Sequence, residues 1–297
     1  MAVIWGIPYL LIKVAVGELT PPSLVFLRTG GGALLLLPLA AARGDLRALV
    51  PRWRAVVLYT VVEIGIPWLL LSEAELRLTS SAAGLLVATV PLIGAILAQA
   101  TGASDRMGLR EFGGLLVGLT GVAALVGLDF SRGDALAYGE MVVVTVCYAV
   151  GPMIIVRRLQ GVPTLGVVAA SLTLTALAYA PAGILQLPAA LPSARVIAAV
   201  ATLAVLCTAV AFLVFFALIA EAGPIRATLI TYVNPAVALS LGVLLLHEPL
   251  TVGAAAGLVL IVLGSFLSTR RRPAPGSARR VEPATERDAR TPSAAAP

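Results

Sequence analysis

The feature that most constrains this chain is a series of ten long apolar runs separated by short polar segments. A helix needs about 20 predominantly apolar residues to cross the hydrocarbon core of a bilayer. Stretches such as ALLLLPLAAA do not alternate between polar and apolar residues, which argues against the strands of an outer-membrane barrel. The sequence therefore predicts an all-α membrane protein with ten transmembrane helices, near residues 2–17, 22–42, 55–72, 80–100, 111–128, 136–156, 164–186, 196–219, 225–246 and 251–268.

Composition supports this class, because 59% of the 297 residues are hydrophobic and only 12% are charged. A soluble domain carries roughly twice that share of charge. The first run begins beside Met1 without a basic leader, so we expect a retained helix and no signal peptide. Cys147 and Cys207 fall inside predicted spans, where they are expected to pack as small apolar residues.

The net charge of +6 comes largely from seven arginines in the last segment, residues 270–297, which is rich in Pro and Ala. Such a segment cannot bury enough apolar surface to fold, so we predict a disordered basic tail. We expect it to lie at an anionic lipid leaflet. No aromatic residue is interleaved with its arginines, so no nucleic-acid partner is predicted.

The arginines also predict orientation, because cationic residues are retained on the cytoplasmic side. With the N-terminus inside, sixteen arginines lie in inner segments and three in outer ones. The prediction is a multi-pass protein of the plasma or inner membrane with both termini in the cytoplasm.

The two halves of the chain resemble each other when the sequence is shifted by 144 residues, which places Lys13 on Arg157 and Pro91 on Pro235. We predict a first unit over residues 1–128, a linker over 129–135, a second unit over 136–269 and the tail over 270–297. Each unit holds five spans, so the second enters the membrane from the opposite side. Inverted repeats of this kind are typical of secondary transporters.

Four stretches carry a family resemblance: WGIPYLLIKVAV, LRTGGGALLLL, LRLTSSAAGLLVATVPLIGAIL and YVNPAVALSLGVLLLHEPLTVGAAAGLVLIVLG. They resemble the EamA family of the drug/metabolite transporter superfamily, over about residues 1–269. The resemblance implies a ten-helix carrier of two EamA repeats, with both termini cytoplasmic. It also implies transport of small polar metabolites, often outward, including amino acids and related compounds. The sequence TGASDR departs from the Leu-Gly-Glu that the family usually shows at that position.

Three charged residues, Lys13, Arg28 and Glu63, lie well inside the predicted spans, away from their ends. Glu63 is about 13 Å and Lys13 about 18 Å from the cytoplasmic end of their helices, close to the middle of the bilayer. Ionisable residues at such depth indicate a functional site, and we predict Lys13 as the partner of Glu63. The alternative is that Lys13 reaches outward to the headgroups. Because burial disfavours the charged form of a carboxyl group, Glu63 is also a candidate for proton coupling.

Arg28 lies about 9 Å from the outer end of its helix, so its side chain could extend to the headgroups. The alternative is a guanidinium that receives a substrate carboxylate through two hydrogen bonds. Trp5 and Tyr232 are the aromatic residues expected to line a central cavity. Pro91 and Pro235 are predicted to bend the helices that flank it, because a proline inside a helix removes a backbone hydrogen bond.

The chain contains no glycine-rich phosphate loop and a single histidine, so we predict no enzyme, no cofactor and no metal site. The favoured function is a secondary active transporter of amino-acid-like or drug-like solutes that exports them by alternating access. A passive channel and a membrane scaffold without transport remain as alternatives. Expected partners are a small-molecule substrate, the lipid bilayer and a coupling proton, and the chain is either a monomer or a homodimer.

Overall fold

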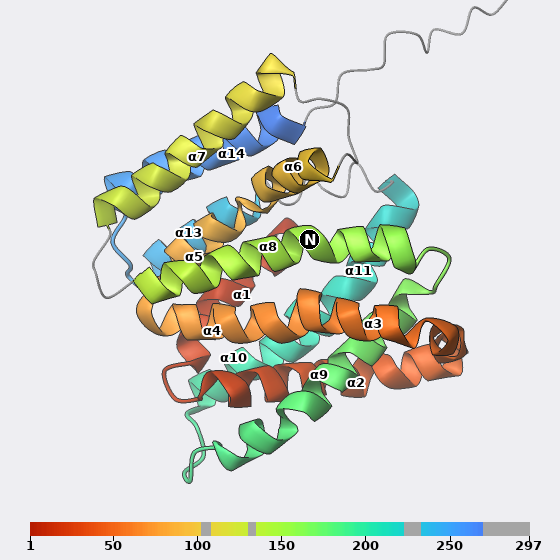
Figure 1. Cartoon of the computed structure of the whole chain (residues 1–297). Coiled ribbons are helices and arrows are strands. Elements are labelled where there is room, and N and C mark those ends of the chain that lie inside the picture. The colour runs from red at the N-terminus through yellow and green to blue at the C-terminus, as the bar shows by residue number, and fades with distance from the viewer. Residues whose placement is uncertain (102–107, 130–134, 223–232, 270–297) are drawn as a thin grey trace, which may run out of the picture.

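The computed structural model describes residues 1–101, 108–129, 135–222 and 233–269, and throughout these ranges it contains helices and no strand (Figure 1). The elements, in chain order, are α1 Ala2–Ala15, α2 Pro21–Ala42, η1 Asp45–Arg52, α3 Trp53–Tyr59, η2 Thr60–Gly65, α4 Ile66–Arg77, α5 Ser80–Val87, α6 Val90–Ala100, α7 Leu109–Asp129, α8 Ala135–Arg158, α9 Thr164–Leu185, α10 Ala194–Ala204, η4 Val205–Val210, α11 Ala211–Ala222, α13 Asn234–Leu245 and α14 Val252–Thr269.

Six helical segments in the described part of the chain are long and apolar enough to cross a membrane: Pro21–Ala42, Asp45–Arg77, Ser80–Leu97, Ala135–Arg158, Thr164–Leu185 and Ala194–Phe215. Three further apolar helices are shorter, namely Ala2–Ala15, Asn234–Leu245 and Val252–Leu267. The all-helical membrane class is therefore confirmed.

Several helices begin at a side-chain cap of the kind that satisfies free backbone N–H groups at a helix start, among them α14, where the hydroxyl of Thr251 accepts from the N–H of Ala254. The hydroxyl of Thr20 accepts from the N–H of Ser23 before α2, and that of Thr79 accepts from Ala82 before α5. Ser193 caps α10 in the same way. These caps explain why short polar segments between apolar runs end one helix and begin the next.

Two helical segments contain a π-helical turn. Such turns are rare in proteins, and many of those that occur lie at functional sites. The first, η2, joins α3 to α4, and the second, η4, joins α10 to α11. Both are six residues long, and a shift of about 145 residues, close to the shift that relates the two halves, carries η2 onto η4. Glu63 lies in the first turn and Thr208 in the second.

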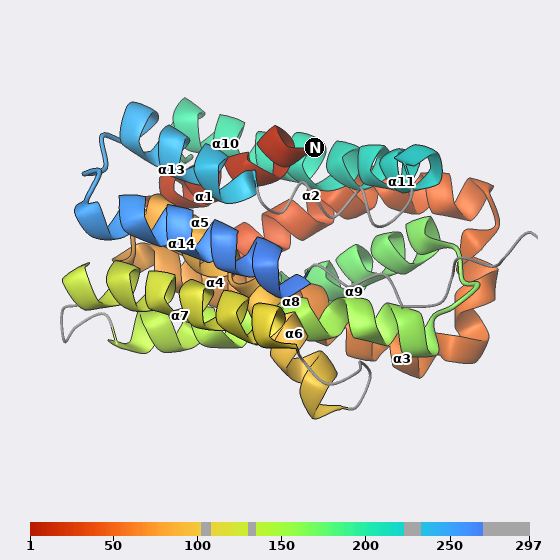
Figure 2. The ribbon, with the colours of Figure 1, turned by 90° about the horizontal axis from the view of Figure 1, so that it is seen from above.

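The α7–α14 pair lies at one edge of the molecule and the α2–α9 pair at the other, with α8 and the α3–α4 segment between them (Figure 1). Glycines allow α7 and α14 to approach closely: a Cβ atom on Gly264 would lie 2.3 Å from the backbone nitrogen of Gly118. The view in Figure 2 shows the same two helices side by side. Close contact through small residues is the usual packing mode of helices in lipid.

Contacts between helix ends fix the relative directions of the central helices. Arg52, just before α3, donates to the carbonyl of Gln160 just after α8, and Arg77 at the end of α4 forms an ion pair with Glu140 near the start of α8. The α3–α4 segment and α8 are therefore antiparallel. Lys13 near the end of α1 donates to the carbonyl of Leu78 just after α4, so α1 runs parallel to that segment and opposite to α8.

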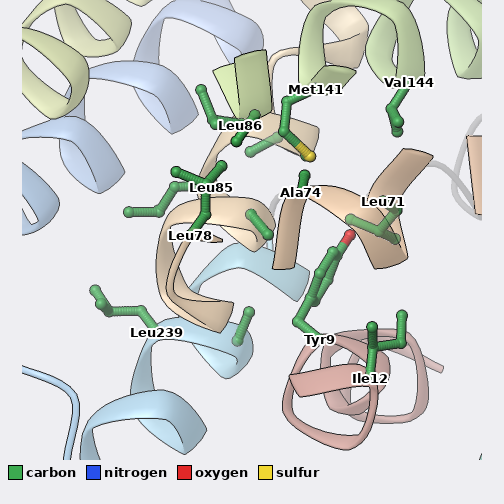
Figure 3. Packing of buried hydrophobic residues seen from close by; sticks show 14 of the residues in the cluster. Tyr9, Ile12, Leu71, Ala74, Leu78, Leu85, Leu86, Met141, Val144 and Leu239 are labelled. Carbon is green, nitrogen blue, oxygen red and sulfur yellow. The ribbon is translucent and has the colours of Figure 1, made fainter. Parts of the chain in front are cut away.

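The largest apolar core lies where α1, α4, α5, α8 and α13 meet (Figure 3). Figure 3 shows Tyr9 and Ile12 of α1 facing Leu71 and Ala74 of α4, with Met141 of α8 on the far side. This cluster holds together helices from both halves of the chain, and the charged residues discussed below are placed around it.

Candidate functional site

Arg28 of α2 points into the protein. Its side chain is only 7% exposed, and its Nε donates a hydrogen bond of 3.2 Å to the hydroxyl of Thr208 in η4. The guanidinium carbon lies 3.6 Å from the centroid of the Trp68 ring on α4, a cation–π contact. The prediction that Arg28 reaches outward to the headgroups is therefore wrong.

The positive charge of Arg28 has no close counter-charge among the described residues. Among the described residues, the only ion pair joins Arg77 to Glu140. Nε is the only nitrogen of the Arg28 guanidinium that donates a hydrogen bond to a described residue. Moving a charge out of water is costly unless it is paired. The stacked Trp68 ring and the neutral hydroxyl of Thr208 compensate only part of that cost.

Tyr148 of α8 links this cationic centre to Glu63. Trp68 belongs to an apolar cluster against which Tyr148 packs, and Tyr148 lies within electrostatic range of both Arg28 and Glu63. Trp68 and Tyr148 thus lie between two groups that the sequence places in separate spans. Trp68 provides the flat surface on which the guanidinium rests.

Glu63 lies in the π-helical turn η2, and its Oε2 atom is buried without a hydrogen-bond partner. The carboxyl group sits directly against Gly151 of α8, where an added Cβ atom would lie 1.7 Å from Oε2. A glycine at this point is what lets the carboxyl reach the backbone of α8. One oxygen of the Glu63 carboxyl group is therefore buried, while the residue as a whole is half-buried.

The predicted pairing of Lys13 with Glu63 is wrong. The Lys13 ammonium donates to two backbone carbonyls at the end of α4, those of Glu75 at 2.5 Å and Leu78 at 2.8 Å. These carbonyls have no partner within their own helix, so a lysine from a neighbouring helix satisfies them. Lys13 reaches these carbonyls rather than the headgroups or the predicted carboxylate.

Glu75 was missed by the sequence reasoning. It is completely buried, and both of its carboxyl oxygens lack a hydrogen-bond partner. A usable signal existed, because Glu75 shares a helical face with Leu71 and Leu78, at spacings of four and three residues. Both of these leucines are buried, so the same face carries Glu75 into the core.

Trp5 of α1 packs against two phenylalanines of α11. Its ring centroid lies 4.7 Å from that of Phe215 and 6.1 Å from that of Phe212. Trp5 therefore joins α1 to the later part of the Ala194–Ala222 segment. Tyr232, the other aromatic candidate, lies outside the described residues.

Pro91 and Pro235 occupy equivalent places in their helices. Each is the second residue of a helix, α6 in one case and α13 in the other. Ahead of Pro91, the helix is interrupted at Ala88 and Thr89. A proline is tolerated in the first turn because its missing N–H would have no partner there. The residues ahead of Pro235 include 223–232, which lie outside the described ranges.

Two cavities lie at opposite ends of the α3–α4 segment. The first has a volume of about 310 Å³ and is lined by residues of α1, the loop that follows α1, α10 and the residue after α13. Its lining includes Lys13, Glu18 and Arg195. The other, of about 300 Å³, is lined by residues of α3, η2, α6 and α8, including Val62 and Arg157. The 144-residue shift that relates the halves carries Lys13 of the first cavity onto Arg157 of the second.

Each cavity lies beside one of the buried carboxyl groups. Val62 and Val150, the neighbours in sequence of Glu63 and Gly151, line the second cavity. Lys13, which binds the backbone of Glu75, lines the first. Within the described ranges, no group of three or more His, Cys, Asp or Glu side chains is arranged to hold a metal ion.

Comparison with known proteins shows a single family over nearly the whole chain. The model of the EamA-like transporter family matches residues 1–127 and 135–270. YvbV, an uncharacterized transporter of Bacillus subtilis (strain 168), is 26% identical over 272 residues, which cover 88% of this chain and 87% of YvbV. YedA, an uncharacterized inner membrane transporter of Escherichia coli (strain K12), is 27% identical over 283 residues, or 89% of each chain.

A protein of known crystal structure shares the fold. It superimposes with a TM-score of 0.66 at 23% sequence identity, covering 90% of this chain and 94% of its own. The helical arrangement described above is therefore one already observed by crystallography.

Proposed function

This chain belongs to the EamA-like transporter family, and from that premise we propose that it is a secondary active transporter of small polar metabolites that works by alternating access. Its apolar helices and its similarity to an inner membrane transporter make it an integral membrane protein. The proposed substrates are amino-acid-like or drug-like solutes, and the proposed direction is outward.

The proposed architecture has ten transmembrane helices in two inverted five-helix units, residues 1–128 and 136–269, with a linker at 129–135 and a basic tail at 270–297. The opposite directions of α1 and α8, which begin the two units, support the inversion. The π-helical turns at equivalent places in the two units support the repeat. The arginine distribution supports cytoplasmic termini.

The observation that carries the proposal is the pair of cavities of similar volume at opposite ends of the α3–α4 segment. They are lined by equivalent helices of the two units. In a carrier built from inverted repeats, the two units rock against each other around a site near the middle of the membrane. One cavity then deepens toward that site while the other closes.

Glu63 is the proposed coupling carboxyl group. It lies between the second cavity and Tyr148, and an unpartnered oxygen gives it no fixed role in holding the fold. Lys13 is proposed to hold the end of α4 at the first cavity, as a gating residue. Trp5 is proposed to face the transport path beside α11, and Pro91 and Pro235 to define where their helices bend.

Counterflow in proteoliposomes tests the carrier mechanism. Vesicles loaded with an unlabelled solute should transiently accumulate the labelled solute, and the exchange should saturate. Conduction without saturable counterflow would identify a channel, and the absence of any flux would identify a scaffold. Candidate solutes come from comparing metabolites in the medium of deletion and overexpressing cells, which also reports the direction of transport.

The coupling role of Glu63 is tested with Glu63→Gln, which keeps the size of the side chain and removes its titration. We expect pH-gradient-driven uptake to be lost while exchange persists. Glu73→Gln in α4 is a matched control that removes a neighbouring carboxyl group. Wild-type uptake by the Glu63 variant would show that the proton is carried elsewhere.

A further inference from the structure

We propose that Glu248 forms a latch between the two units beside the first cavity, and that this latch breaks each time the cavity deepens during transport. The inference rests on the transport function proposed above and adds a gating residue to it. Glu248 lies in the turn between α13 and α14, in the second unit, and its carboxyl group reaches the start of α5 in the first unit.

Three hydrogen bonds make this contact. Oε1 of Glu248 accepts from the backbone N–H of Ser80 at 2.7 Å, and Oε2 accepts from the backbone N–H of Ser81 at 3.0 Å and from the Ser81 hydroxyl at 2.5 Å. Backbone N–H groups in the first turn of a helix have no partner within that helix, and the positive end of the helix dipole favours a carboxylate there. Hydrogen bonds to an ionised carboxylate are also among the stronger ones in proteins. A single side chain therefore joins the two units.

The backbone around Glu248 is shaped to hold this contact. His247 has a φ of 55°, in the left-handed region that residues other than glycine adopt rarely, and the N–H of Glu248 turns back to donate to the carbonyl of Gly242. A Cβ atom on Gly242 would lie 2.3 Å both from Oε2 of Glu248 and from Oγ of Ser81. The glycine therefore leaves the space that the carboxyl group occupies between α13 and α5. Unfavourable backbone conformations of this kind cluster at functional and switching segments.

A second carboxyl group crosses between the units in the same way. Glu18, just after α1 in the first unit, accepts from the N–H and the hydroxyl of Ser193 at 2.7 and 2.6 Å, and Ser193 caps α10 in the second unit. Glu18 lines the first cavity, and so does Leu246, two residues before Glu248. Two carboxylate–serine contacts between the units thus lie beside the first cavity.

The surroundings of these contacts favour a latch over a permanent brace. Glu248 is half-buried and Glu18 is exposed, so water reaches both carboxyl groups. A carboxylate and an N–H group that separate in contact with water exchange one hydrogen-bond partner for another, so the net cost of separation is modest. When the units of an inverted-repeat carrier rock, the contacts that join them beside one cavity break as that cavity deepens. Glu248 therefore sets how often the first cavity is deep.

Cysteine labelling of the purified full-length protein measures this equilibrium without a substrate. The native cysteines, Cys147 and Cys207, are buried and are replaced by alanine to give the background. Val14→Cys reports on the first cavity, which Val14 lines, and Met153→Cys reports on the second in the same way. The rate of alkylation by N-ethylmaleimide is measured for each reporter in a separate variant.

Glu248→Gln keeps the size of the side chain and removes its charge. We expect it to speed the labelling of the Val14→Cys reporter by about 10-fold, because it weakens charge-assisted hydrogen bonds, and to slow the labelling of the Met153→Cys reporter. Ser81→Ala removes one of the three hydrogen bonds and should act in the same direction with a smaller effect. Glu73→Gln in α4 is the matched control and should leave both rates unchanged.

Opposite changes at the two cavities are the signature of a latch, because loss of a structural brace loosens both. Unchanged labelling at both reporters, or faster labelling at both together with a lower Tm, overturns the latch. Opposite changes in a protein that shows no counterflow leave the latch standing and overturn the transport function. Counterflow by the wild type, together with unchanged labelling in Glu248→Gln, overturns the latch alone.

Discussion

Replacement of Gly151 by alanine tests the role of Glu63 without altering the carboxyl group itself. The new Cβ atom would lie 1.7 Å from Oε2 of Glu63 and 2.8 Å from its Cδ. Non-bonded heavy atoms pack at about 3.5 Å, so the carboxyl group must move by roughly 1.5–2 Å. The carboxyl group ends a flexible side chain beside a cavity, so it can move without shifting the backbone. We therefore expect a stability cost at the low end of the range for overpacking, which is about 1–3 kcal/mol.

The effect on coupled transport should be much larger than the effect on stability. A reacting group displaced by about 1 Å commonly loses activity on the order of 100-fold. We therefore expect pH-gradient-driven uptake by Gly151→Ala to fall by about that factor, while Tm changes by only a few degrees. Uptake is measured in proteoliposomes with a solute identified by counterflow, and Tm by thermal unfolding of the purified protein.

Gly139→Ala is the matched control, because Gly139 lies on the same helix and a Cβ atom there meets nothing within 4 Å. It should leave both uptake and Tm close to the wild type. If Gly151→Ala transports as well as Gly139→Ala, the position of the Glu63 carboxyl group is irrelevant to coupling and the reasoning fails.

Three further predictions concern the fold. Gly264→Ala forces apart the backbones of α7 and α14 and should lower Tm, with a cost of about 1–3 kcal/mol, whereas Gly113→Ala on the open face of α7 should not. Lys13→Met leaves the carbonyls at the end of α4 without donors and should cost about 1–3 kcal/mol, also measured by thermal unfolding; an unchanged Tm would contradict the capping role. The hydroxyl and backbone N–H of Ser193 lower the pKa of Glu18, so this contact stabilises the fold above the ordinary glutamate pKa and is lost as pH falls through the lowered value. The Tm difference between the wild type and Glu18→Gln should therefore shrink as pH falls below about 4, and a constant difference would refute the linkage.

The positions of the helices could be predicted from the sequence because each apolar run is long and bounded by polar residues. The runs at 22–42 and 164–186 correspond to Pro21–Ala42 and Thr164–Leu185 within one residue at each end. For Pro91 the sequence predicted a bend, and the structure has a break between helices just ahead of it, because a proline cannot occupy a helix position whose N–H must donate. Length and turn chemistry are local properties, so a single sequence contains them.

The partners of the charged residues could not be predicted in the same way. The rise along a helix gives depth, but the direction of a side chain around the helix axis depends on how neighbours pack. Lys13 and Glu63 were placed at similar depth, yet Lys13 faces the end of α4 and Glu63 faces α8. The π-helical turn that contains Glu63 changes the direction of the side chains beyond this turn. No residue pattern in the sequence VVEIG predicts a π-helical turn.

For Arg28 a signal was present but was not used. Gly32 lies four residues later and so shares its helical face, and a Cβ atom there would lie 2.9 Å from the Thr208 side chain. A glycine at that spacing marks the face of α2 that approaches another helix. Since a residue on that face cannot extend into lipid, Arg28 is directed inward.

The near equality of the two cavities, about 310 and 300 Å³, bears on the energetics of the transport cycle. If rocking opens one cavity and closes the other, equivalent helices line the opening in the inward-facing and the outward-facing states, so the two states have similar helix contacts. The direction of net transport by the proposed carrier would then be set by the gradients of the solute and of the coupled proton, and reversing those gradients should reverse the flux.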